Sequence, residues 1–154
     1  MSRLAFLFFL GCAFLAACRP PVASPEPVPS KIVQWSGQQK GAPVAGFHVL
    51  RYPAEWTHFW QQVEQPPPRS LDLAREMAVV IFLGSKSTAG YSAEVRWIEE
   101  RNGKLIVNYQ EQSPAPGAMV AQVLTSPWVI AIVARSDLPV VGRARPSPAS
   151  ASPQ

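Results

Sequence analysis

Residues that build reactive sites are scarce in this sequence. It holds 2 cysteines and 2 histidines among 154 residues, and Cys12 lies in an apolar N-terminal run. At most Cys18 remains outside that run, which excludes an intramolecular disulfide and a multi-cysteine metal site. His48 and His58 have no third ligand at a matched spacing. We therefore expect neither a metal ion nor any other cofactor.

Catalytic motifs and clusters of basic residues are also missing. Ser87 and Ser92 lack a Gly-x-Ser-x-Gly context, and the sequence places no histidine beside them. Glu94 and Glu111 fall at offset positions of a predicted hairpin, which does not support a glycosidase pair. The 14 basic and 10 acidic side chains are spread singly along the chain. We expect a non-enzymatic protein that binds no nucleic acid.

The N-terminus has the pattern of an export signal. Arg3 precedes an apolar run over 4–15, which is shorter than the about 20 residues needed to span a bilayer. The order Leu15-Ala16-Ala17-Cys18 resembles a bacterial lipobox, and that resemblance implies that Cys18 becomes a lipid-modified first residue. The alternative is an ordinary secretory signal cut near Ala17, which leaves a free thiol.

These features predict how the chain is divided. We expect a signal peptide over 1–17, an acylated proline-rich tether over 18–30, one α+β domain over 31–141 and a disordered, low-complexity tail over 142–154. The lipid anchor would hold the protein at the membrane of a bacterial cell envelope.

Apolar patterns within the domain predict one main helix packed on a largely antiparallel, twisted sheet. The helix begins at Pro53 and carries its apolar residues at helical spacing. Two uninterrupted apolar runs are typical of strands buried on both faces. The expected elements are strands over 32–35 and 47–51, the apolar helix stripe Trp56, Phe59, Trp60 and Val63, a single turn within 70–76, strands over 77–83 and 128–134, and short extended segments over 119–125 and 138–141.

A β-hairpin is predicted at Asn102-Gly103, the strongest short hairpin signal. A two-residue turn there pairs Glu100 with Leu105 and Ile98 with Val107. Continuing that register would place the apolar residues of the first strand on the wrong face. One extra residue near 96–98 removes the conflict, so we predict a β-bulge that leaves Val95 opposite Tyr109.

The segment 84–95 joins a buried strand to an alternating one through glycines and small polar residues, and marks the rim of the sheet. Its glycines superficially suggest a phosphate loop, but the closing Gly-Lys-Ser/Thr is missing and a strand follows. A small anion site and a simple polar turn both remain open here. The expected partner-binding residues lie in this turn and in the loop after the hairpin: Lys86, Ser87, Thr88, Gly90, Tyr91, Ser92, Pro114 and Pro116.

The chain resembles the C-terminal domain of PrcB-like protease-complex proteins over about 47–135. The resemblance rests on an ordered set of motifs. These are Glu55-Trp56-x-x-Phe59-Trp60, Gly84-x-Lys86-x-Thr88-x-Gly90-Tyr91-Ser92, Asn102-Gly103, Pro114-x-Pro116-Gly117 and Thr125-x-Pro127. Ala89 departs from the glycine expected there. The resemblance implies an accessory protein, exported or lipid-anchored, that binds and stabilises a secreted protease complex.

Two hypotheses about function follow. In the first, the rim loops or an unpaired sheet edge bind a protease or another envelope protein. In the second, a pocket between helix and sheet, near Lys86 and Arg96, binds a small ligand or an anion. An enzyme would need a histidine or carboxylate cluster that only folding assembles.

Overall fold

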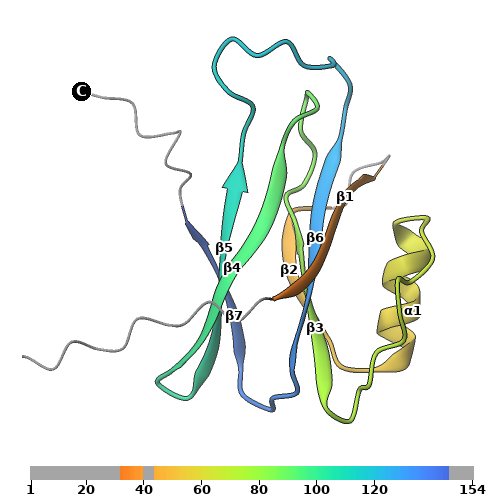
Figure 1. Ribbon diagram of the computed structural model, residues 1–154, viewed down its shortest axis with the longest axis vertical. Coiled ribbons are helices and arrows are strands. Elements are labelled where there is room, and N and C mark those ends of the chain that lie inside the picture. Colours follow the sequence, from red (N-terminus) through yellow and green to blue (C-terminus); the bar gives the residue numbers. More distant parts are fainter. Residues whose placement is uncertain (1–31, 40–43, 146–154) are drawn as a thin grey trace, which may run out of the picture.

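The computed structural model describes residues 32–39 and 44–145 (Figure 1). The predicted signal peptide, Cys18, the tether and residues 146–154 of the predicted tail lie outside these residues. Within the described residues, no helix is long and apolar enough to cross a membrane.

The described chain forms two sheets and one helix. One sheet has four antiparallel strands in the order β1-β6-β3-β2, and the other has three in the order β4-β5-β7, with β5 and β7 parallel. The elements are β1 (Val33–Gln39), β2 (Gly46–Leu50), α1 (Pro53–Gln62), β3 (Glu76–Phe82), β4 (Ser92–Arg101), β5 (Lys104–Gln112), β6 (Ser126–Ala134) and β7 (Val140–Arg145). The prediction of one helix on a largely antiparallel sheet is therefore met in outline, with a second sheet added.

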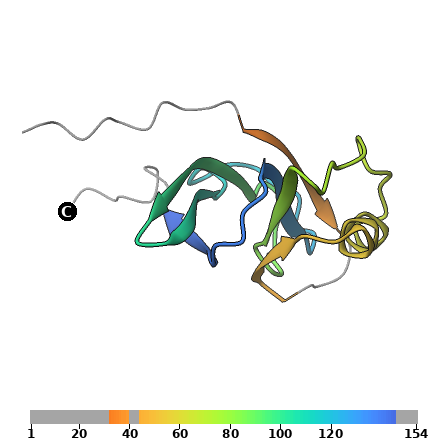
Figure 2. The ribbon, with the colours of Figure 1, turned by 90° about the horizontal axis from the view of Figure 1, so that it is seen from below.

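Three layers result, with α1 on one side of the four-stranded sheet and the β4-β5-β7 sheet on the other (Figure 2). Strand β3 is apolar throughout because it is buried on both faces. Val80 and its even-numbered neighbours pack beneath α1. Val79 and its odd-numbered neighbours pack against the second sheet. This confirms β3 as a central strand, and β6 is buried in the same way.

Helix α1 buries the stripe that its sequence predicts. Trp56, Phe59 and Trp60 are all buried, and their rings meet edge to face. At the N-terminus, Glu55 Oε2 accepts hydrogen bonds from the backbone N–H of Arg51 at 2.7 Å and of Tyr52 at 3.1 Å. This carboxylate satisfies donors that have no partner within the helix.

The hairpin between β4 and β5 has the predicted register. Asn102 and Gly103 have φ angles of 52° and 66°, as a two-residue turn of this type requires. Glu100 faces Leu105, Ile98 faces Val107, and Val95 faces Tyr109, with the register shifting between Val95 and Trp97. Both the turn and the bulge are confirmed.

Three larger differences from the prediction occur, the first at Gly37. Strand β1 runs through this glycine to Gln39 instead of ending at Trp35. A Cβ on Gly37 would lie 2.7 Å from Cζ2 of Trp128. The glycine therefore admits a neighbouring indole and does not mark a turn.

The other two differences concern the C-terminal half. Strand β7 continues to Arg145, where we expected a disordered tail from 142, because it pairs along β5. The segment 119–125 forms no strand, and its one β-bridge joins Thr125 to Lys86. Both outcomes depend on partners distant in sequence.

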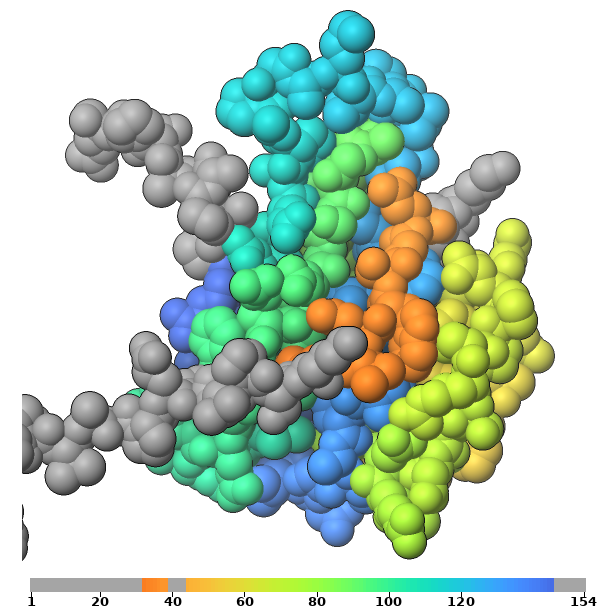
Figure 3. Space-filling view, in the orientation of Figure 1, coloured from red at the N-terminus to blue at the C-terminus, as the bar shows by residue number. Residues whose placement is uncertain are grey.

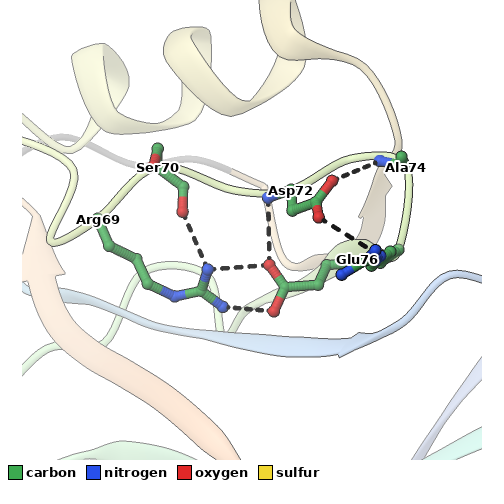
Figure 4. A network of polar contacts seen from close by, with 6 residues as sticks. Arg69, Ser70, Asp72, Ala74 and Glu76 are labelled. Carbon is green, nitrogen blue, oxygen red and sulfur yellow. Dashed lines mark hydrogen bonds and ion pairs between the residues drawn. The ribbon is translucent and has the colours of Figure 1, made fainter.

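The segment after α1 is fixed by an ion pair (Figure 4). Arg69 donates to both oxygens of Glu76, at 2.8 and 2.9 Å. This hydrogen bond holds the pKa of Glu76 below its ordinary value. The expected single turn begins at Asp72, whose carbonyl accepts from the N–H of Glu76 at 2.7 Å.

The two sheets meet at two corners. At one, β1 lies beside β4, as Figure 3 shows, and Gln34 and Gln38 bond the backbone of Val95 and Tyr91. At the other, β2 lies near β7, and the ring of Phe47 packs over Gly142.

Candidate functional site

Two loops meet at one end of the molecule, uppermost in Figure 1. We call residues 84–92 and 113–125 together the rim. Lys86 and Thr125 exchange backbone hydrogen bonds of 2.8 and 2.9 Å, and the N–H of Ala89 donates to the carbonyl of Ala121 at 2.9 Å. The hydroxyl of Thr125 also donates to the carbonyl of Thr88 at 3.0 Å. The two loops therefore form one surface.

Gly90 lies where one of these loops packs closely against the other. Its φ is +92°, and a Cβ there would lie 2.9 Å from Cγ of Pro114 and 3.3 Å from Val120. Both the dihedral angle and the contact require glycine. The short polar turn predicted from the sequence is thus held in place by the loop that follows the hairpin.

The charge on the rim is paired. Lys86 Nζ forms an ion pair with Glu111 and lies 5.1 Å from the centroid of the Tyr91 ring. Burial raises the pKa of nearby Tyr109, and the charge of Glu111 adds to the effect. Arg96, the other cation of the expected anion pocket, pairs with Glu94 at 2.9 Å.

The structure brings the predicted partner-binding residues together, but exposes them unequally. Ser87, Gly90 and Pro116 are exposed. The others are half-buried: Lys86, Thr88, Tyr91, Ser92 and Pro114. These eight residues therefore mark the position of the surface, but most of them contribute little exposed area to it.

The larger exposed side chains of the rim come from a segment that we expected to be a strand. Met119 is 102% exposed, Leu124 63% and Val123 51%. No charged residue occurs from 112 to 134. That uncharged stretch was visible in the sequence, but apolar residues are ordinarily assigned to a core.

A separate concave site lies between α1 and β2. This cavity of about 520 Å³ is lined by residues that include His48, His58 and Glu55, not by Lys86 and Arg96 as the ligand hypothesis expected. In the described parts of the chain, no three His, Cys, Asp or Glu side chains are placed to hold a metal ion.

Comparison with known proteins identifies one family. Residues 77–134 match the family model described as PrcB C-terminal. This stretch runs from β3 to the end of β6 and contains the whole rim and the hairpin. No curated protein and no solved structure matches the chain. This segment, which carries most of the motifs noted in the sequence, is therefore similar to the PrcB C-terminal family.

Proposed function

We propose that this protein is a non-enzymatic, lipid-anchored envelope protein that uses its rim to bind and stabilise a secreted protease complex or another envelope protein. The observation that carries the proposal is the exposed, uncharged loop 113–125. Exposed apolar side chains gathered on one uncharged loop are typical of interaction sites. The similarity of residues 77–134 to a family named for PrcB favours a protease complex as the partner.

The charge of the rim favours a protein over a lipid surface. Surface-bound segments usually present Lys or Arg beside their apolar residues. Lys86 is the one charged residue within 84–92 and 113–125, and Glu111 neutralises it. The core of a protein interface is likewise depleted of charge.

The direction of β1 is consistent with an anchored arrangement. Val33 lies opposite Ile132, whereas Gln39 lies opposite Ser126, beside the rim. The chain therefore enters the fold at the end away from the rim. An anchor at Cys18 would leave the rim projecting from the membrane, where a partner can reach it.

The test is site-specific crosslinking with the full chain in its own cell. A photoreactive amino acid at Met119 should give a discrete protein adduct, identified by mass spectrometry. The same residue at Val141, which is 43% exposed on β7, is the matched control. The paired substitution Met119→Ser and Leu124→Ser should abolish adducts formed from a photoreactive residue at Val123.

Two outcomes would contradict the proposal. Adducts of equal yield from Val141 would contradict the claim that the rim is the binding surface. The proposed lipid anchor would be contradicted if a Cys18→Ala variant stayed equally bound to the membrane and no labelled palmitate entered the original chain.

A further inference from the structure

The cavity beside α1 has an apolar floor and a polar mouth. We call it the α1–β2 groove. Its floor includes Phe59, Val80 and Phe82, which are 3%, 1% and 6% exposed. His48 and His58 are exposed at its mouth. Its volume of about 520 Å³ lies within the range of ligand sites.

One wall of the groove is the edge of a sheet. Within the described chain, β2 pairs with β3 and with no other strand. Every second residue of an edge strand directs its N–H and C=O away from the sheet. At the opposite edge of the same sheet, β1 is joined to β4 of the second sheet through hydrogen bonds between Gln34 and Val95. Strand β2 therefore combines an unpaired edge with an adjoining cavity.

The alternation of side chains along β2 connects the edge to the groove. Leu50 packs on the α1 side, and Phe47 and Val49 pack between the sheets. A strand added beside β2 would alternate in the same way, so every second side chain would enter the groove. The N–H and C=O groups along this edge match the spacing of a second extended backbone, which favours a polypeptide over a small molecule.

The ionisable groups at the mouth favour an acidic flank on the occupant. The carboxylate of Glu55 accepts from the backbone N–H of Arg51 and Tyr52, at 2.7 and 3.1 Å. His48 and His58 remain, and an imidazole N–H of either ring can donate a hydrogen bond to a carboxylate of the occupant.

We infer that the α1–β2 groove binds an extended segment of a partner protein by strand addition to β2. The segment carries apolar side chains at every second position and an Asp or Glu at one flank. This site is separate from the rim, and shares with the proposed function only the premise that the chain binds other proteins.

The test is selection of a random seven-residue peptide library, displayed on phage, against the immobilised full chain. We expect enriched peptides with alternating apolar residues and an acidic flank. A synthetic copy of an enriched peptide should slow amide hydrogen exchange in 46–50. The substitution His58→Trp, which fills the groove, should weaken its binding at least tenfold.

Matched variants separate this site from the rim. Gln61→Trp places the same side chain on an exposed position of α1 that does not line the groove. It should leave binding unchanged, as should Met119→Ser with Leu124→Ser. Lack of enrichment, equal binding to His58→Trp, or loss of binding in the rim variant would each overturn the inference. So would a small molecule that fills the groove without displacing the peptide.

Discussion

The side-chain amide of Gln34 bonds both backbone groups of Val95. Its Nε2 donates to the carbonyl at 3.2 Å, and its Oε1 accepts from the N–H at 2.9 Å. The side chain thus takes the place of a neighbouring strand at the outer edge of β4. It joins the two sheets through a residue that is only 2% exposed.

Replacing Gln34 with Leu should lower the free energy of unfolding by about 2 kcal/mol or more, because both backbone groups of Val95 lose their partner. Urea denaturation measures the change. Gln38→Leu is the control, since its bond to Tyr91 is exposed and 3.4 Å long. Equal effects of the two substitutions would show that the amide of Gln34 has no special role.

Gly90→Ala should destabilise the rim by about 1–3 kcal/mol, because it imposes an unfavourable φ and a contact with Pro114. Gly117→Ala tests the two causes separately. Its φ is +78°, but a Cβ there meets nothing within 4 Å. We expect Gly117→Ala to cost about 1 kcal/mol, as measured by thermal unfolding. Equal losses would assign the whole effect to the dihedral angle.

The Arg69–Glu76 pair should make stability depend on pH. The pKa of Glu76 is lowered in the folded chain, mainly by its hydrogen bond to Arg69. Its contribution is therefore fully present above the ordinary value of 4.5 and is lost as the pH falls through the lowered pKa.

Urea midpoints of Glu76→Gln and the original chain should differ at pH 7 and converge below pH 4.5. Glu100→Gln, at an exposed position, is the control. A difference that persisted unchanged in acid would exclude the charge of Glu76 as its cause.

Gly142→Ala should disturb the corner where β7 meets β2. A Cβ there would lie 2.5 Å from Cδ2 of Phe47, so we expect a loss of about 1–3 kcal/mol from overpacking. Shortening the partner should relieve the clash. In a double-mutant cycle, Gly142→Ala should cost less in a Phe47→Leu background, and strict additivity would contradict the contact.

Local signals in the sequence predicted the parts of the fold that depend on neighbouring residues. Asn102-Gly103 fixes its own turn, and the bulge follows from the alternation of the two strands beside it. The prediction that β1 ends before Gly37 was wrong, because this glycine makes room for the indole of Trp128, which is distant in sequence. The continuation of strand β7 beyond 141 was missed, because it forms only by pairing with β5.

The site was predictable to a similar degree. The conformational demand on Gly90 follows from its local sequence, so the position of the rim could be inferred. The exposure of Met119 could not, because an apolar residue is ordinarily placed in a core. The α1–β2 groove depends on how one helix sits over an edge strand, which no short motif describes.

The chain crosses between the two sheets more than once, so neither sheet is formed by one continuous stretch of sequence. Along the chain, β4 and β5 belong to one sheet, β6 returns to the other, and β7 comes back to the first. The stretch 77–134 shared with the family therefore contains parts of both sheets but lacks β1, β2 and β7. An excised copy of that stretch would reduce both sheets to two strands each, β3–β6 and β4–β5, and a two-stranded sheet by itself is at best marginally stable in water. The stretch that matches the family model is thus shorter than the part of the chain that we expect to fold as one cooperative unit.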